Sequence, residues 1–266
     1  MEAFVDKLRV VLRRDLLTAL RYRSGFALTI AGAIVELAAF FYLSRAIGPG
    51  FRPDGVDYFS FLLVGTGFYT FLVMSVNSFF STVQEAQQTG TLEVLMTTAT
   101  PPAMLVFLNA LSALARNLVQ LIVYVVAGLL LFRAPSQLNV IGCLLMFVFT
   151  LLIASALGIF AAAVQLAIQK GSAVVWLLGS GLWFLTGTLF PVSSLPTPLQ
   201  VLSRIIPITY LLDGLRLALI EGAPTARLLP DILVLSGFSL ILLPLSVVVF
   251  SWTLRRARIL GTLSFY

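Results

Sequence analysis

Histidine is absent from this chain of 266 residues, and Cys143 is its one cysteine. The chain therefore lacks the commonest metal ligand and the commonest proton shuttle near neutral pH. One cysteine also excludes an internal disulfide framework. Charged residues make up only 11% of the sequence, whereas soluble domains carry roughly a quarter. These absences argue against a disulfide-stabilised secreted domain and against an ordinary soluble protein.

Lysine is scarce as well. Lys7 and Lys170 are the only two lysines, and neither follows a glycine-rich loop of the kind that binds nucleotide phosphates. We therefore expect no ATP site and no cofactor on this chain. Without histidine or clustered carboxylates, the sequence also offers no catalytic dyad or metal cluster.

Apolar residues dominate what is present. They form 59% of the sequence, and the mean hydropathy is +1.03. With about 20 apolar residues needed per crossing, the sequence predicts an all-α integral membrane protein, a single domain over residues 1–266 with six transmembrane helices. The predicted spans are Gly25–Ile47, Tyr58–Thr82, Ala103–Phe132, Leu138–Ile168, Ser172–Phe190 and Ile232–Leu254.

The first 24 residues are basic and amphipathic. Phe4, Leu8, Leu12 and Leu16 share one helical face, and most basic residues lie elsewhere. We interpret residues 1–24 as an interfacial helix that lies on the membrane. The alternative is a solvated basic segment that only sets orientation. A signal peptide is not expected, because the segment is charged and has no small-residue cleavage pattern.

Basic residues also predict the orientation. The net charge of +6 comes largely from the runs Lys7–Arg23 and Arg255–Arg258. Such runs beside apolar spans are topology signals rather than nucleic-acid patches, and lysine and arginine favour the cytoplasmic side. We therefore expect both termini in the cytoplasm and the protein in the cytoplasmic (inner) membrane.

A polar segment without lysine or arginine separates the second and third spans. Residues 83–102, VQEAQQTGTLEVLMTTATPP, predict a short amphipathic helix outside the bilayer, with Thr89 or Thr91 as its N-cap. We interpret this segment as the docking site for another protein, with Glu85 and Glu93 facing a basic cleft. The alternative is that the two carboxylates are only solvated.

Residues 191–231, between the last two spans, are apolar but interrupted by prolines. Leu199–Ile206 and Ile208–Ile220 predict two helices too short to cross. They fit a re-entrant pair on the outer side. Asp213 and Arg216 stand at i and i+3 and are predicted to form an ion pair.

Two charges fall within predicted spans, namely Glu36 and Arg116. Charges there are costly and are usually paired or functional. We favour a structural ion pair between neighbouring helices, and the alternative is that both face a polar substrate path.

Aromatic and small residues add two packing predictions. The aromatic side chains of span two are expected to face lipid rather than a conduit; they are Phe68, Tyr69, Phe71, Phe79 and Phe80. The row Ala154, Gly158 and Ala162 predicts close helix packing within the subunit.

Three segments together resemble one known family. They are the basic N-terminal helix, the stretch Glu85…Thr89-Gly90-Thr91-Leu92-Glu93-Val94-Leu95 followed by Thr100-Pro101, and Leu189-Phe190-Pro191 with Pro207-Ile208-Thr209-Tyr210-Leu211-Leu212-Asp213-Gly214-Leu215-Arg216. In this order along nearly the whole chain, they are similar to the transmembrane subunit of an ABC-2 type ATP-binding-cassette exporter.

The resemblance implies a function and a set of partners. It implies a permease that exports a hydrophobic or amphipathic substrate, such as a drug-like molecule, a lipid or a lipid-linked glycan. It implies a homodimer or pseudo-dimer of six-helix subunits in the lipid bilayer, with two copies of a separate ATPase subunit that would hold the ATP and Mg, and no nucleic-acid partner. The implied ATPase contacts, in a coupling helix, are Glu85, Thr89, Gly90, Thr91, Leu92, Glu93 and Leu95, and the implied outer gate is Pro207, Tyr210, Asp213 and Arg216.

Two other functions stay open. An ion-coupled carrier would use ionisable groups at the membrane midplane, and Glu36 and Arg116 are the candidates. A membrane-embedded lipid-modifying enzyme is disfavoured, because the sequence shows no catalytic cluster.

Overall fold

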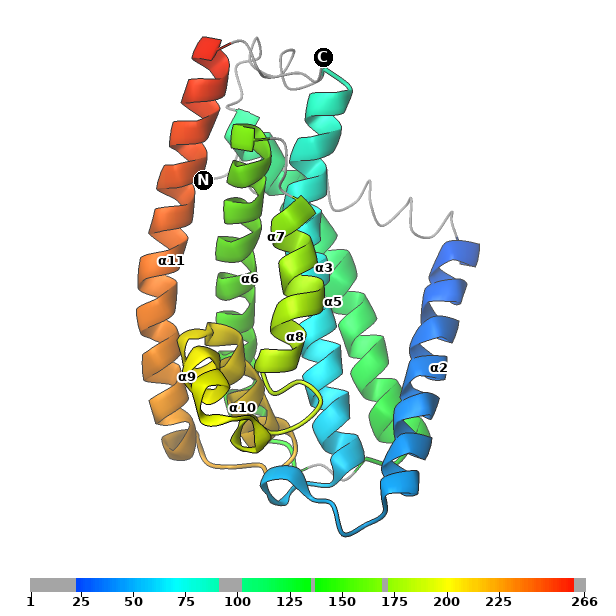
Figure 1. The fold of residues 1–266 in the computed structure, drawn as a ribbon. Coiled ribbons are helices and arrows are strands. Elements are labelled where there is room, and N and C mark those ends of the chain that lie inside the picture. The colour runs from blue at the N-terminus through cyan, green and yellow to red at the C-terminus, as the bar shows by residue number, and fades with distance from the viewer. Residues whose placement is uncertain (1–22, 91–101, 135–136, 169–171, 261–266) are drawn as a thin grey trace.

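The computed structural model describes residues 23–90, 102–134, 137–168 and 172–260. In these ranges the chain forms long helices that run roughly side by side, with two short helices near one end (Figure 1). The described ranges hold no β-strand, which confirms the all-α prediction. The predicted interfacial helix, residues 1–24, lies outside them apart from its last two residues, and it stays a prediction.

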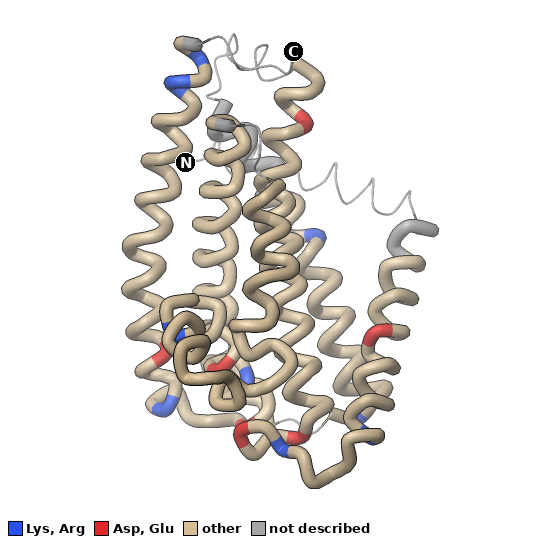
Figure 2. Tube along the Cα trace, viewed as in Figure 1, with Lys and Arg blue, Asp and Glu red and all other residues tan. Residues whose placement is uncertain are grey.

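Within the described ranges, five helices are long and apolar enough to cross a membrane. They are α2 (Arg23–Ile47), α3 (Tyr58–Gln88), α5 (Pro102–Leu131), α6 (Val140–Ile168) and α11 (Thr225–Leu260). Charged residues in the described ranges lie mainly near the two ends of the bundle, and few lie between (Figure 2). This arrangement is that of a multi-pass membrane protein.

The predicted fifth span is shorter than the sequence indicated. It consists of α7 (Ser172–Trp176), the π-helical turn η2 (Leu177–Gly181) and α8 (Leu182–Leu185), of 5, 5 and 4 residues. At 1.5 Å per residue these reach about 21 Å, less than the roughly 30 Å of a hydrocarbon core. The chain then turns at Gly187, whose φ is +74°, instead of continuing to Phe190 as a helix.

Helix α3 is the centre of the bundle. It contacts α2, α5, α6, α7 and α10. In an 18-residue apolar stretch of this helix, 83% of the residues are buried. The prediction that its aromatic side chains face lipid was wrong. A helix that is apolar on every face can be covered by its neighbours on every face. The aromatic residues concerned are each at most 8% exposed: Phe68, Tyr69, Phe71, Phe79 and Phe80.

Small residues allow α6 to pack closely on α3. Ala154 and Ala162 are buried, and a Cβ atom added to Gly158 would lie 2.4 Å from Cδ2 of Phe79 on α3. The row of small residues therefore packs within the subunit, as the sequence predicted. Helix α6 also packs along α11, so α3, α6 and α11 form a contiguous layer.

Two short helices follow α8, as the sequence predicted: α9 (Thr197–Ile205) and α10 (Pro207–Leu219). Helix α10 packs against α3, α6 and α11. Its C-terminal end is fixed to the segment before α6, because the backbone N–H of Asn139 donates to the Ala218 carbonyl at 2.9 Å. The re-entrant position of this pair in a bilayer stays a prediction.

Helix α11 begins at Thr225, earlier than the predicted start at Ile232. Residues 225–231 were predicted to belong to the segment 191–231 that precedes the last span. The side chain of Arg227 is 63% exposed and pairs with Glu221 at 3.6 Å, so this charge lies outside the bundle and does not interrupt the helix.

Candidate functional site

A buried arginine connects α10 to the centre of the bundle. The guanidinium of Arg216 donates to the carbonyl of Gly187 at 2.7 Å and to that of Thr188 at 3.4 Å. Its Cζ lies 3.5 Å from the centre of the Phe61 ring on α3, and Nη1 lies 3.4 Å from the carboxylate of Asp213. We call these five residues the Arg216 clamp. The clamp joins α10, the turn after α8 and α3.

The predicted ion pair between Asp213 and Arg216 is confirmed, but its two members differ in exposure. The side chain of Arg216 is 5% exposed and that of Asp213 is 46% exposed. Burial lowers the pKa of the Arg216 guanidinium to about 10 and the Asp213 carboxylate opposes that shift, so Arg216 is charged at neutral pH. The buried partners of Arg216 are the two carbonyls and the Phe61 ring, whereas Asp213 is the exposed one.

Glycine at position 65 makes the clamp possible. A Cβ atom there would lie 2.3 Å from the Thr188 carbonyl oxygen and 2.7 Å from Nη2 of Arg216. Any side chain at Gly65 would therefore push the turn and the guanidinium away from α3. One turn further along α3, the Tyr69 hydroxyl donates to the carbonyl of Leu178 in the π-helical turn η2. The segment from α7 to the turn after α8 therefore contacts α3 at two places.

The other two predicted gate residues form the corner between α9 and α10. Pro207 is at the N-terminus of α10, where its missing N–H costs no helical hydrogen bond. The Tyr210 hydroxyl donates to the Arg204 carbonyl at 3.0 Å. This bond satisfies one of the carbonyls at the end of α9 that have no partner within the helix.

At the opposite end of α3, the helix continues beyond the predicted boundary. The predicted span two ends at Thr82 and the predicted polar segment begins at Val83, but α3 runs to Gln88, and Val83 is fully buried. Thr89 is the C-cap of α3 and not an N-cap. Gly90, with φ of +66°, then ends the helix in the left-handed conformation that glycine favours.

The predicted ATPase contacts fall only partly within the described ranges. Glu85 and Thr89 are exposed near the end of α3, and the Thr89 hydroxyl donates to the Glu85 carbonyl at 2.8 Å. The rest of that predicted set, Thr91, Leu92, Glu93 and Leu95, lies outside the described residues. An exposed carboxylate and hydroxyl therefore precede Gly90 on a rigid helix.

A buried pair of amides fixes this end of α3 to α6. The Gln165 amide donates to Oε1 of Gln87 at 3.0 Å, and the two side chains are 1% and 0% exposed. Among the described residues, Nε2 of Gln87 has no acceptor. The pair ties α3 to α6 only two residues before the C-cap.

Leucine substitutions test whether the hydrogen bond between Gln87 and Gln165 stabilises the folded protein. Gln87→Leu alone or Gln165→Leu alone leaves one buried amide without its partner and is expected to cost about 1–3 kcal/mol. The double variant removes both polar groups and should be less destabilised than the sum of the two single variants. Thermal unfolding of the four proteins in one detergent tests this, and additive costs would show that the amides do not interact.

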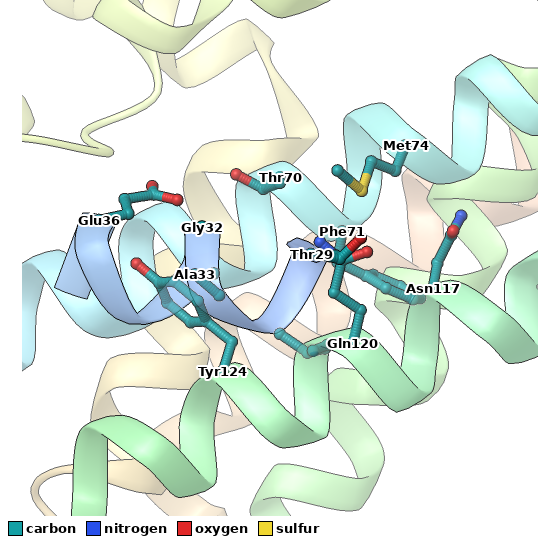
Figure 3. A pocket seen from close by; sticks show the side chains of 12 residues that line it. Thr29, Gly32, Ala33, Glu36, Thr70, Phe71, Met74, Asn117, Gln120 and Tyr124 are labelled. Atoms are coloured by element: carbon teal, nitrogen blue, oxygen red, sulfur yellow. The ribbon is translucent and has the colours of Figure 1, made fainter. Parts of the chain in front are cut away.

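A cavity of about 200 Å³ with a mixed polar and apolar wall lies between α2, α3 and α5 (Figure 3). One stripe of each helix lines it, at helical spacing. Helix α2 contributes Thr29, Gly32, Ala33 and Glu36, α3 contributes Gly67, Thr70, Phe71 and Met74, and α5 contributes Asn117, Gln120, Leu121 and Tyr124. All three helices are membrane-span candidates, so the cavity places several polar side chains within the apolar part of the protein.

The favoured ion pair between Glu36 and Arg116 is not found among the ion pairs of the described residues. Both side chains are exposed, but Glu36 lines the cavity and Arg116 is not one of the lining residues. The two charges therefore have different surroundings, and only Glu36 belongs to the cavity.

Sequence reasoning missed most of the groups that build these sites. Phe61 and Gly65 were read as ordinary span residues, and Thr29 and Thr70 were not singled out. A usable signal was present for the cavity, because polar residues recur at positions 29 and 36 of α2 and at positions 117, 120 and 124 of α5. Recurrence at i, i+3 and i+7 places side chains on one helical face.

Comparison with known proteins gives one clear result. The model of one protein family, described as ABC-2 type transporter, matches residues 6–220. This match includes α2, α3, α5, α6 and the helices through α10. No curated protein sequence matches the chain.

Proposed function

Because the chain belongs to the ABC-2 type transporter family, whose membrane permeases pair with an ATP-binding subunit, we propose that it is the permease subunit of an exporter. It moves a hydrophobic or amphipathic substrate outward across the cytoplasmic membrane. Two copies of the chain associate with two copies of a separate ATPase, which holds ATP and Mg. The segment from Glu85 to Leu95 docks on that ATPase.

The observation that carries the proposal is the single helix α3. Its 31 residues extend about 46 Å at 1.5 Å per residue. One end carries Phe61 of the Arg216 clamp and the adjacent Gly65, and the other carries Gln87, which bonds to Gln165, and the exposed Glu85. A close-packed helix held at both ends transmits displacement as a unit. Motion applied near Glu85 therefore reaches the clamp, on the side where we place the outer gate.

In this account the cytoplasm is at the Gly90 end and the exterior is at the α9–α10 end. Arg255, Arg256 and Arg258 near the C-terminal end of α11 support this orientation, because basic residues favour the cytoplasmic side. The Arg216 clamp then lies on the outer side and forms the outer gate. The gate is closed while Arg216 joins α10 to the turn at Gly187, and it opens when the two separate.

Purification from native membranes tests the proposal. A tagged chain should retain a second polypeptide that hydrolyses ATP, and the complex in liposomes should move substrate only when ATP is supplied on the Gly90 side. Transport by the chain alone that follows an ion gradient would instead establish an ion-coupled carrier. Chemical conversion of lipid by the purified chain would establish an enzyme.

A further inference from the structure

The cavity between α2, α3 and α5 carries one formal charge. Of the described residues that line it, only Glu36 is ionisable near neutral pH, and no arginine or lysine is among them. A carboxylate within a membrane-spanning helix is costly unless a group of opposite charge compensates it. The lining residues supply no positive charge opposite Glu36, so a bound cation would compensate the carboxylate.

Hydrogen bonds within the wall leave acceptors for a bound group. The Thr66 hydroxyl donates its proton to the Leu62 carbonyl at 2.7 Å, so the Tyr124 hydroxyl, 2.9 Å from Thr66, must donate to Thr66. The lone pairs of the Tyr124 oxygen remain. The Asn117 amide nitrogen similarly donates to Ser78 at 3.2 Å, which leaves its carbonyl oxygen as an acceptor. Acceptors and a carboxylate suit a cation.

Aromatic rings strengthen this preference. Tyr124 and Phe71 both line the cavity (Figure 3), and a ring face attracts an ammonium group within about 6 Å of its centre. A phosphate or carboxylate would meet the Glu36 charge instead and be repelled. The same wall therefore disfavours an anionic ligand such as a lipid-linked glycan phosphate.

The size of the cavity limits what enters it. Its volume of about 200 Å³ is below the roughly 300–1,000 Å³ of sites that enclose a drug-sized ligand. A head group fits and a whole amphiphile does not. Met74, which lines the cavity and is 38% exposed, offers an apolar surface along which a hydrocarbon tail can leave.

We propose that this cavity binds the positively charged head group of an amphipathic organic cation, an alkylammonium compound, with its tail outside the cavity. The inference rests on the proposed function and narrows the substrate from amphipathic molecules in general to cationic ones. Glu36 supplies the opposite charge, and Tyr124 and Phe71 form part of the wall beside the ammonium group.

Equilibrium dialysis of the full-length chain in lipid nanodiscs tests the proposal, with empty nanodiscs subtracted. The probes are tritiated dodecyltrimethylammonium and tritiated dodecyldimethylamine N-oxide, which share a tail and differ in net charge. Wild-type protein should bind the cation saturably and at least 10-fold more tightly than the N-oxide. Absence of saturable binding, or equal affinity for the two probes, would overturn the proposal.

Two variants locate the site. Glu36→Gln should reduce the cation-to-N-oxide affinity ratio by at least 10-fold, and a ratio is independent of how much protein folds. Glu221, whose side chain is 33% exposed and pairs with Arg227 outside the cavity, gives a carboxylate control, and Glu221→Gln should keep the wild-type ratio. An unchanged ratio in Glu36→Gln would rule out this cavity.

A space-filling variant covers the case in which Glu36→Gln fails to fold. Gly32 lines the cavity, and a Cβ atom added to it meets nothing within 4 Å. Gly32→Leu should therefore fold and weaken cation binding by at least 10-fold. Gly237 on α11 is equally open, so Gly237→Leu is its matched control and should bind as the wild type does.

Failure here and failure of the proposed function are separable. The binding assay uses neither ATP nor an ATPase, so a negative result leaves ATP-driven export intact with a different substrate class. Conversely, cation binding with no ATPase partner would keep the cavity assignment and reject the export mechanism.

Discussion

Replacing Arg216 with leucine is expected to lower the stability of the folded chain by about 3 kcal/mol and to abolish transport. A desolvated cation–π contact such as that with Phe61 contributes about 2 kcal/mol. The buried Gly187 carbonyl would lose its donor at 2.7 Å, which costs about 1–3 kcal/mol. The apolar leucine side chain recovers part of this loss. Thermal unfolding in detergent, with uptake assays on the same preparations, measures both effects.

Two further variants make this prediction specific. Arg216→Lys keeps the charge but lacks the planar donor fork that reaches two carbonyls while stacking on a ring, so its stability should lie between those of wild type and Arg216→Leu. Arg227, 63% exposed, is the control, and Arg227→Leu should change stability by about 0.5 kcal/mol or less. If Arg216→Leu unfolds at the wild-type temperature, the clamp does not hold α10 to α3.

Replacing Gly90–Leu95 with a glycine–serine linker of equal length is expected to abolish ATP-driven transport. The linker keeps the chain connection between α3 and α5 but removes the residues predicted to contact the ATPase. Because α3 ends at Gln88 and its bundle contacts lie before Gly90, the folded helices should be unaffected. Substrate uptake by the reconstituted complex, together with helical content by circular dichroism, measures the result.

The control for this replacement is the loop that begins at Gly48, at the other end of the bundle. Changing the exposed Phe51 and Arg52 to serine should leave coupling to ATP intact. Wild-type transport by the Gly90–Leu95 replacement would show that the ATPase acts elsewhere on the chain.

Hydropathy predicted the membrane-spanning helices well, because span length and polarity limits are properties of local sequence. The starts of α2, α3, α5 and α6 each lie within two residues of the predicted ones. The C-terminal end of α3 was missed because Gln84, Glu85 and Gln87 are polar. Burial of Gln87 against Gln165 depends on a partner 78 residues away, which local sequence cannot reveal.

In the candidate sites, too, local contacts could be predicted from the sequence and contacts between distant elements could not. The Asp213–Arg216 pair was predictable, because i and i+3 positions are neighbours on any helix. The stronger partners of Arg216 are backbone carbonyls at Gly187 and Thr188 and a ring on α3. Those contacts exist only once α3, α8 and α10 are packed together. Likewise, the sequence shows that Glu36 is a charge within a predicted span, but the cavity that it lines exists only where α2, α3 and α5 pack together.

Cysteine labelling at Thr89 tests the central claim that an ATPase acts on α3 from the cytoplasm. Cys143 is the one native cysteine, so Thr89→Cys with Cys143→Ala leaves a single thiol at an exposed position. In intact cells a membrane-impermeant maleimide should not react with it, and in inverted vesicles a short bifunctional reagent should cross-link it to an ATP-hydrolysing subunit. Reaction with the impermeant reagent from outside, or no cross-link to such a subunit, would contradict the account.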